Sequence, residues 1–283
     1  MGESESGNVT GLVIALGGRI YALHEGTIVQ LGERRNLVHS LCVHEGRLYD
    51  AGRTMQVVDT LTGETVAERD HWVLALCSHA GRLYDAGSTN RIFDTFGGTE
   101  VGKREDAIQA LCSHGGRLYD AGDSCRVYDT LAENPVATRE DWILALCSHE
   151  GRLYDAGAGG EIYETLSSTV VARREEAVLA LASVRGRLYD AGEERRVYET
   201  LSGAVLGERE EPVAVLCAHQ GTLYDGGTQG WLFDSLTNRN VLAGRKAITA
   251  ACSVPADLFA ALLARGEQVP QPSWGKLTDW FAG

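Results

Sequence analysis

One segment of 35 residues, repeated along the chain, constrains the possible folds of this sequence more than any other feature. Its clearest copy runs from Val73 to Ala107, and near copies begin at Val38, Ile108, Ile143, Val178 and Val213. The tyrosine of a shared Gly-Arg-Leu-Tyr-Asp core recurs at the same spacing, at Tyr49, Tyr84, Tyr119, Tyr154, Tyr189 and Tyr224. A fixed period of roughly 20–50 residues indicates a repeat architecture, in which each unit packs against its neighbours.

Each unit contains four short extended runs separated by glycines and turn-forming pairs. In the clearest copy these runs are Val73–Cys77, Arg82–Ala86, Arg91–Thr95 and Glu100–Arg104. The first run is continuously apolar and the fourth is mostly polar. This gradient predicts that the first strand is innermost and the fourth lies at the rim of a small antiparallel sheet.

A lone four-stranded sheet of this size buries too little surface to be stable, so the units must pack against one another. A repeat of two helices, such as the tetratricopeptide, needs helices of roughly 12–15 residues, and the glycines at both ends of each Gly-Arg-Leu-Tyr-Asp-Ala-Gly segment prevent that. Sheets packed face to face around an axis satisfy the pattern. We therefore predict an all-β fold, a seven-bladed β-propeller of four-stranded antiparallel blades with a short C-terminal helix and tail.

The ends of the chain depart from the regular repeat. Gly18-Arg19-Ile20-Tyr21 stands 28 residues before Tyr49 and is interpreted as the second strand of a shorter first copy. Its other strands are expected at Val9–Leu16, Thr27–Leu31 and Glu33–Leu37. We assign residues 1–7 to a disordered tail, 8–254 to the propeller with a closing strand at 248–254, and 255–283 to a C-terminal helix (Asp257–Arg265) and a docked tail with Trp274 and Trp280.

Composition and charge narrow the class of protein. The net charge of −13 argues against nucleic-acid binding, which needs a basic stripe. It suits a soluble protein; solubility itself is favoured as the reason for the charge, and a basic protein partner is the alternative. No apolar run approaches a membrane span, and the first residues lack a secretion signal. Six of the seven cysteines occupy one repeat position, which predicts small, buried, reduced thiols rather than disulfides. We expect a cytoplasmic monomer without cofactor or membrane contact.

The repeat resembles a WD-repeat (WD40-like) blade. The resemblance rests on the apolar strand Val73–Cys77, on Gly81 before the second strand, on Ala86-Gly87 after it, and on the aromatic-acid pair Phe93-Asp94. It extends from Val9 to Val254. The period is shorter than the family's forty-odd residues, and the Trp-Asp and Gly-His pairs are absent. The resemblance implies a rigid platform for protein partners and no catalysis.

Two rings of polar residues were considered as sites of chemistry. Cys77 and His79 share a strand face, and the pair recurs in five copies. A metal needs about four ligands at one point, so we favour over zinc a Cys that packs between blades and a His that caps the turn into the second strand by a hydrogen bond. The copy with Ala182 and Val184 loses both residues without visible compensation. The repeated aspartates, such as Asp85, form a ring of like carboxylates. Catalysis needs an asymmetric group, so we expect these aspartates to satisfy backbone groups or a neighbouring Arg or His, with a cation-binding channel as the alternative.

The loops between the second and third strands vary between copies and are expected to lie together at one end of the ring. The connections from fourth to first strands reach the same end and bring two tryptophans, a residue type that is common in interfaces. Drift of unselected loops is the alternative explanation. The predicted partner-binding residues are Arg53, Trp72, Asn90, Asp123, Trp142, Glu194, Arg195 and Gln229.

Three functions are compatible with this pattern. The favoured hypothesis is a non-enzymatic interaction scaffold that docks a protein on the varied loops. The alternative is a multivalent propeller that binds a small ligand or carbohydrate at one similar site per blade. An enzyme that uses the central channel would need a unique polar cluster that breaks the repeat, and none is visible.

Overall fold

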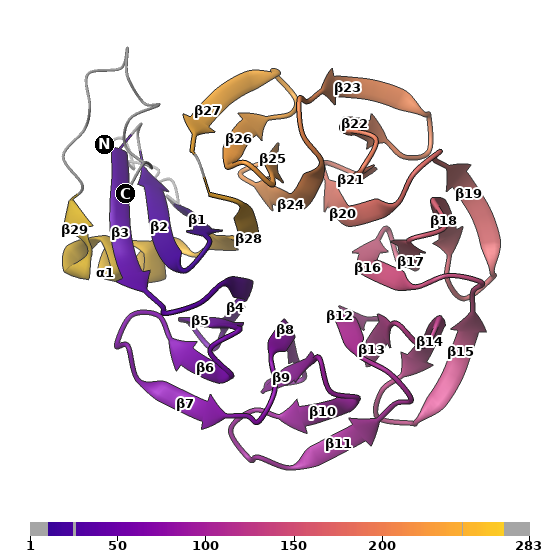
Figure 1. Ribbon diagram of the computed structural model, residues 1–283, viewed down its shortest axis with the longest axis horizontal. Helices are drawn as coiled ribbons and strands as arrows, with labels where there is room; N and C mark the ends of the chain where they lie inside the picture. The colour runs from indigo at the N-terminus through magenta and orange to yellow at the C-terminus, as the bar shows by residue number, and fades with distance from the viewer. Residues whose placement is uncertain (1–10, 25–26, 245, 269–283) are drawn as a thin grey trace, which may run out of the picture.

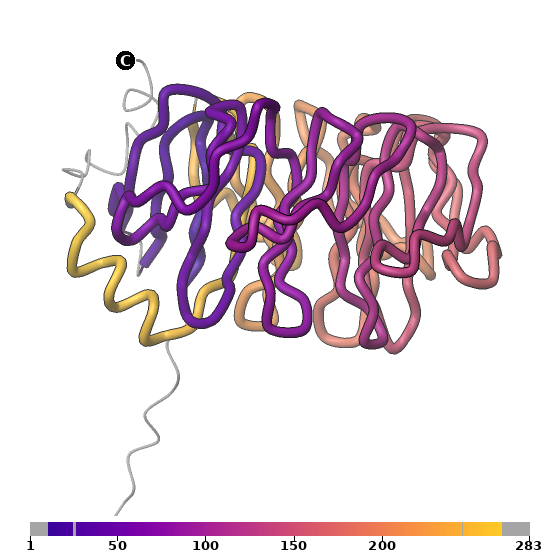
Figure 2. The backbone as a smooth tube through the Cα atoms, turned by 90° about the horizontal axis from the view of Figure 1, so that it is seen from below, coloured from indigo at the N-terminus to yellow at the C-terminus, as the bar shows by residue number. Residues whose placement is uncertain are grey.

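The computed structural model describes residues 11–24, 27–244 and 246–268. Over these residues the strands form seven sheets arranged in a closed ring, as the sequence predicted (Figure 1). Seen from the side, the ring is a thick disc with loops at both ends (Figure 2). The proposed tail at residues 1–7 and the segment with Trp274 and Trp280 lie outside the described residues.

Blades 2 to 7 have the same order of strands. The first strands are innermost: β4 (Val38–His44), β8 (Val73–His79), β12 (Ile108–His114), β16 (Ile143–His149), β20 (Val178–Val184) and β24 (Val213–His219). The second strands are β5 (Arg47–Gly52), β9 (Arg82–Gly87), β13 (Arg117–Gly122), β17 (Arg152–Gly157), β21 (Arg187–Gly192) and β25 (Thr222–Gly227).

The outer half of each blade follows in chain order. The third strands are β6 (Gln56–Asp59), β10 (Arg91–Asp94), β14 (Arg126–Asp129), β18 (Glu161–Glu164), β22 (Arg196–Glu199) and β26 (Trp231–Asp234). The fourth strands are β7 (Thr65–Glu68), β11 (Glu100–Lys103), β15 (Asn134–Thr138), β19 (Thr169–Arg173), β23 (Ala204–Glu208) and β27 (Arg239–Ala243).

The second strand, rather than the first, is the most buried element of a blade. Its leucine is fully buried in every regular copy, as Leu83 and Leu118 illustrate, because both faces of the strand pack against neighbouring blades. The first strand borders the central channel and stays partly accessible, as in β12. The hairpin between the two strands needs positive φ at both central residues, such as Ala80 (48°) and Gly81 (73°), which explains the conserved spacing of this glycine within the repeat.

The first blade corrects our interpretation of the first copy. Its sheet has the order β28-β1-β2-β3-β29, with strands β28 (Ile248–Val254), β1 (Gly11–Leu16), β2 (Arg19–His24), β3 (Thr27–Glu33) and β29 (Glu267–Gln268). β28 is therefore the innermost strand and β1 the second. Gly18-Arg19-Ile20-Tyr21 belongs to the third strand, and no strand forms over residues 34–37, which link β3 to β4.

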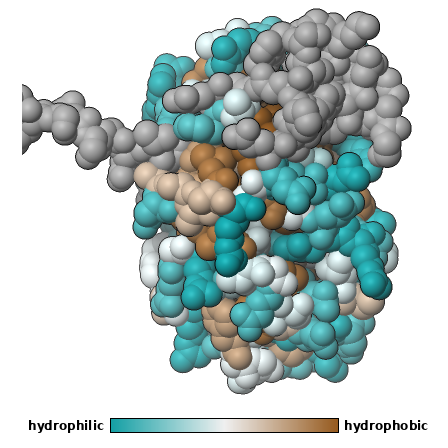
Figure 3. Space-filling view, turned by 90° about the vertical axis from the view of Figure 1, so that its left-hand side faces the viewer, coloured by the Kyte–Doolittle hydropathy of each residue, from teal (hydrophilic) through white to brown (hydrophobic). Residues whose placement is uncertain are grey.

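The two ends of the chain close the ring together. β28 pairs antiparallel with β1, from Gly11 opposite Val254 to Leu16 opposite Ile248, and lies between β24 and β4. Helix α1 (Ala256–Arg265) then packs on the outside of blade 1. Leu258, Phe259 and Leu262 of α1 are buried in the same cluster as residues of β1, β2 and β4. On this side of the molecule, hydrophobic atoms appear among hydrophilic ones (Figure 3).

Candidate partner-binding end of the ring

The varied loops and the connections between blades meet at one end of the ring. We call the loops between second and third strands the inner loops, the connections from fourth to first strands the links, and this end the link end. The amide of Ser88 in an inner loop donates to the Trp72 carbonyl in a link (3.0 Å), and Ala158 donates to Trp142 in the same way (2.9 Å). A Cβ atom on Gly87 would lie 1.9 Å from the Trp72 oxygen, so this close approach requires glycine.

All eight predicted partner-binding residues lie at the link end, distributed over five junctions of the ring. Trp72 and Trp142 are 43% and 57% exposed, and Arg53, Arg195 and Gln229 are exposed as well. Arg53 and Trp72 are in contact across one junction, with the guanidinium 4.5 Å from the indole centroid. The structure therefore presents separate surface residues rather than one compact cluster.

Three of the eight residues hold their own loops in place. Asn90 donates its side-chain amide to the Arg104 carbonyl (2.6 Å), and Asp123 accepts a hydrogen bond from Gln109 (2.9 Å). Glu194 accepts hydrogen bonds from the Glu175 amide and the Tyr198 hydroxyl. These side chains stabilise the link end, so they contribute less free surface than the sequence suggested.

The links at five consecutive junctions are acidic, which gives the link end an uneven distribution of charge. In these links an arginine is followed by one or two acidic residues, whereas Arg35 and Lys246 stand in the links that flank the first blade. The positions with exposed carboxylates are Asp70, Glu105, Asp106, Glu140, Asp141, Glu175, Glu176 and Glu210. We call this set the acidic arc.

Each aspartate of the ring is bound by an arginine of the preceding link. Arg104 donates to both carboxylate oxygens of Asp120 (2.7 and 2.6 Å), and Thr130 donates to the same carboxylate (2.8 Å). The guanidinium also lies 4.2 Å from the centroid of the Tyr128 ring. Equivalent Arg–Asp pairs are Arg34–Asp50, Arg69–Asp85, Arg139–Asp155, Arg174–Asp190 and Arg209–Asp225.

These pairs confirm the structural role expected for the aspartates, because an arginine already neutralises each carboxylate. The junction between blades 7 and 1 replaces the pair with apolar residues: Ile14 stands at the aspartate position and Gly244 at the arginine position. Ile14 is fully buried among Leu16, Leu242 and Ile248. The ring therefore contains a buried ion pair at six junctions and apolar packing of Ile14 at the seventh.

Histidines at the end of the first strands bond to the next blade, rather than capping the turn as we expected. His79 Nδ1 lies 2.8 Å from Ser113 Oγ, and the same contact joins four other junctions. Where His is lost, the partner changes too: Val184 packs with Ala218, and Val254 with Val43. The sequence interpretation found no such compensation for Val184, because the partner lies in another blade.

Burial disfavours the thiolate form of the first-strand cysteines. Burial raises the pKa of the Cys77 and Cys217 thiols to about 12 and that of Cys42 to about 11. Thiolate is the reactive form, so such thiols are poor nucleophiles and poor metal ligands. Within the described ranges, no group of three or more His, Cys, Asp or Glu side chains is arranged to hold a metal ion.

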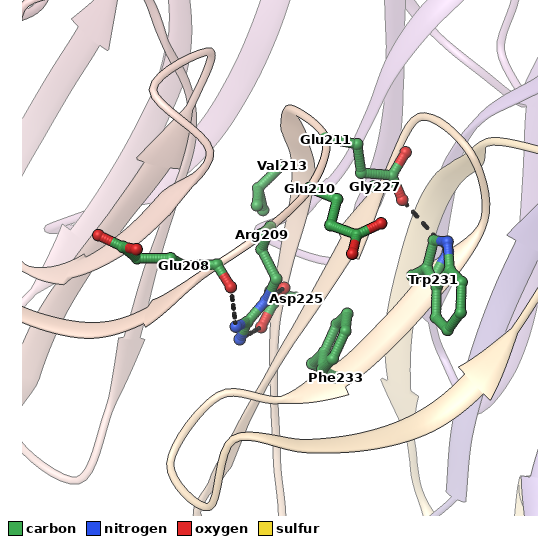
Figure 4. A pocket seen from close by; sticks show the side chains of 9 residues that line it. All are labelled: Glu208, Arg209, Glu210, Glu211, Val213, Asp225, Gly227, Trp231 and Phe233. Carbon is green, nitrogen blue, oxygen red and sulfur yellow. Dashed lines mark hydrogen bonds and ion pairs between the residues drawn. The ribbon is translucent and has the colours of Figure 1, made fainter.

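Two pockets at the link end occupy equivalent positions in the repeat. A pocket of about 210 Å³ between blades 6 and 7 is lined by Glu210, Glu211, Trp231 and Phe233, among others (Figure 4). A second, of about 250 Å³ between blades 4 and 5, includes the equivalent residues Glu140, Asp141, Glu161 and Tyr163, with Trp142 at its edge. Sequence reasoning missed the first pocket, although Trp231 breaks a repeat position that is arginine in four other blades.

Comparison with known proteins supports the fold and goes no further. The chain is similar to the computationally designed Ika8 protein, with a TM-score of 0.60 and 14% identity over 89% of this chain and 95% of that one. It is also similar to the WD40 β-propeller domain of Doa1, with a TM-score of 0.64 and 12% identity over 80% and 88% of the two chains. No protein-family model and no curated protein matches the sequence.

The fold and the link end together define the class of the protein. It is a seven-bladed β-propeller with a WD40 domain among its structural neighbours. Within the part of the chain that the structure describes, no helix is long and apolar enough to cross a bilayer.

Proposed function

We propose that the protein is a non-enzymatic, WD-repeat-like interaction scaffold that docks a basic protein partner on the link end. The acidic arc carries this proposal: it places exposed carboxylates in five consecutive links, beside the exposed rings of Trp72 and Trp142. A surface of one charge attracts a partner of the opposite charge and speeds association, while large aromatic side chains supply contact area. We further propose a cytoplasmic monomer.

The way in which the buried polar residues are used supports a non-enzymatic function. The buried carboxylates, such as Asp85 and Asp120, are bound by arginine and hydroxyl groups in the same way in each regular junction. A general acid and base require different environments for two groups. The repeat makes these environments nearly equal, which supports a platform for binding.

The two equivalent pockets give the multivalent ligand-binding alternative some support. They share an arginine, two acidic link residues and an aromatic ring, as one similar site per blade requires. Their third-strand residues differ, however, with Trp231 in one and Glu161 in the other. A single ligand would therefore meet unequal sites, and the scaffold remains the favoured function.

Affinity purification from native lysate, followed by mass spectrometry, tests the docking surface. The double variant Glu140→Lys/Glu175→Lys reverses charge in the acidic arc, and Glu64→Lys/Glu150→Lys makes the same charge change in exposed hairpins at the other end. We expect basic proteins retained by the wild type to be lost with the first variant and kept with the second. Equal recovery with the first variant, or loss with the second alone, would contradict the proposed surface. Several equal ligand sites per chain would favour the alternative.

A further inference from the structure

The pocket between blades 6 and 7 lies where blade 7 lacks the arginine that other blades carry at the start of the third strand. The first residue of the third strand is arginine in blades 1, 3, 4 and 6, namely Arg19, Arg91, Arg126 and Arg196. In blade 4, Arg126 Nη1 lies 3.3 Å from the carboxylate of Glu105 in the link. Blade 7 has Trp231 at the position of Arg126 and Glu210 at the position of Glu105. The chain thus shows a guanidinium beside this link carboxylate in one blade and replaces it with an aromatic ring in another.

Glu210 and Glu211 give the pocket in blade 7 negative charge, and neither carboxylate forms an ion pair with a cation among the described residues. Glu210 is exposed and forms no ion pair among the described residues. Glu211 is only 2% exposed, and its carboxylate accepts hydrogen bonds from neutral donors: the Thr228 hydroxyl (3.1 Å) and the amides of Gln229 and Trp231 (3.4 Å for the latter). A buried carboxylate that lacks a counter-ion favours a cation nearby, because the protein interior screens charge weakly.

The cations already present are occupied by other groups. Arg209 donates to both oxygens of Asp225 (2.7 and 2.6 Å) and to the Glu208 carbonyl (3.0 Å). The side chain of Glu208 pairs with Arg196 (3.0 Å) and is therefore also satisfied. Glu210 and Glu211 remain as the carboxylates that a ligand could neutralise.

The aromatic residues of the pocket provide a surface suited to a planar cation. Trp231 and Phe233 lie on one face of β26, with ring centroids 6.3 Å apart and planes at 23°. The guanidinium of Arg209 already lies 4.2 Å from the Phe233 centroid, so one such contact is present in the pocket (Figure 4). Tryptophan is the best ring for a cation–π contact, and a guanidinium group can stack on it while it donates hydrogen bonds in its plane.

We propose that this pocket binds the guanidinium group of an arginine side chain from the partner protein. The ligand arginine lies against Trp231 and donates to Glu210, which replaces the contact that Arg126 makes with Glu105 in blade 4. This inference rests on the proposed function, since it assigns a recognition site to the docking surface. The acidic arc around the pocket selects a basic segment of the partner.

The equivalent pocket in blade 5 lacks the feature that would favour this ligand. Glu161 takes the place of Trp231, and it is already near Arg173 (3.7 Å). The aromatic wall is therefore incomplete, and an arginine of the chain competes for the carboxylate. The two pockets form a matched pair for testing the role of Trp231.

Isothermal titration with a short peptide, acetyl-Gly-Arg-Gly-amide, tests the site without a partner protein. We expect the wild type to bind this peptide, and to bind the neutral citrulline analogue roughly tenfold more weakly, because the cation–π and charge-assisted contacts are lost. Trp231→Arg should abolish binding, since the chain's own arginine then fills the site as in blade 4. Glu161→Arg, which makes the same change in blade 5 with a larger change of charge, should leave affinity within about twofold.

Thermal unfolding of each variant controls for folding, and Glu210→Gln provides a second, milder loss of the site. Failure of the wild type to bind the arginine peptide, equal affinity for citrulline, or unchanged binding by folded Trp231→Arg or Glu210→Gln would overturn the assignment. Loss of binding in Glu161→Arg would overturn its location. If the peptide binds but the lysate yields no basic partner, only the docking proposal falls. If basic partners are captured but no peptide binds, only the arginine site falls.

Discussion

At the scale of single residues, the junctions between blades depend on charges that are buried in pairs. The Arg104 and Asp120 side chains are 3% and 1% exposed, and each satisfies the other through two hydrogen bonds. Such a pair gains little over apolar packing, because both groups lose their hydration. The apolar junction at Ile14 illustrates this equivalence. Removal of one partner is different, since it leaves the other charge buried and alone.

Asp120→Ala should therefore be strongly destabilising. We expect it to lower the free energy of unfolding by about 3–5 kcal/mol, since the buried Arg104 guanidinium loses its counter-ion and Thr130 loses its acceptor. Urea unfolding measures the change. Arg91→Ala is the control: its pair with Glu100 is about half exposed, and its loss should cost at most about 1 kcal/mol. Similar losses in the two variants would contradict this account.

The buried thiols predict a loss of stability at high pH. Burial raises the pKa of Cys147 in the folded chain to about 12, above the ordinary value of 9.0. The folded state therefore retains a proton that the unfolded state releases, so stability is full below pH about 9 and falls as the pH rises towards 12. Between pH 8 and pH 10 we expect a loss on the order of 1 kcal/mol per thiol.

Urea unfolding at pH 8 and pH 10 measures this loss, and Cys147→Ala isolates the contribution of one thiol. Alanine is compatible with the position, because Ala182 occupies it in blade 6. Burial also raises the pKa of several tyrosines, such as Tyr154, and these add to the slope in both proteins. An equal pH dependence in the variant and the wild type would contradict a half-buried Cys147 that stays protonated in the folded state.

The residue patterns predicted the structural role of each repeat position, but not which residue of the next blade it contacts. The aspartates were expected to bind backbone groups or a neighbouring arginine or histidine, and arginine is the partner in each regular junction. The His–Ser contacts were missed because Ser113 lies 34 residues from His79 in sequence, on a neighbouring sheet. The paired changes at Val184 and Ala218 are a signal within the sequence that could have revealed the contact.

At the scale of elements, the order of strands followed from the repeat, whereas the assignment of the first blade did not. Gly18-Arg19-Ile20-Tyr21 resembles the second strand of a unit, but it also matches the third-strand pattern Arg126-Val127-Tyr128. The innermost strands begin at Val38 and recur at the same spacing up to Ile248. These are already seven innermost strands, so β1 is not one of them. Pairing between β28 and β1 joins opposite ends of the chain, and no local pattern specifies it.

Contacts between neighbouring blades can be tested with a double-mutant cycle. His114 Nδ1 lies 2.8 Å from Ser148 Oγ across the junction of blades 4 and 5. We expect His114→Val/Ser148→Ala, which copies Val184 and Ala218, to lose less stability than the sum of the two single variants, by roughly 0.5–1.5 kcal/mol. Chemical unfolding of the four proteins gives the coupling energy. Additive losses would show that the two side chains do not act as a pair.

At the scale of the whole molecule, stability depends on closing the ring, because each sheet is too small to fold alone. β28 supplies the inner strand of blade 1 and packs between β24 and β4. Ile248 and Val254 belong to two different core clusters, one on each side of the blade. Helix α1 only adds to this closed structure from outside. Truncations at the two boundaries therefore should have different consequences.

A chain that ends at Ala247 should lose cooperative folding. Without β28, β1 becomes an unpaired edge of its sheet, and two core clusters lose the side chains that β28 contributes. A chain that ends at Val254 keeps β28 and should remain a folded ring. Its free energy of unfolding should fall by several kcal/mol, since Leu258, Phe259 and Leu262 no longer cover blade 1, at roughly 1.5–3 kcal/mol for each buried side chain. Near-ultraviolet circular dichroism and urea unfolding distinguish the two. Cooperative unfolding of the shorter chain at the wild-type midpoint would mean that the ring does not depend on its closing strand.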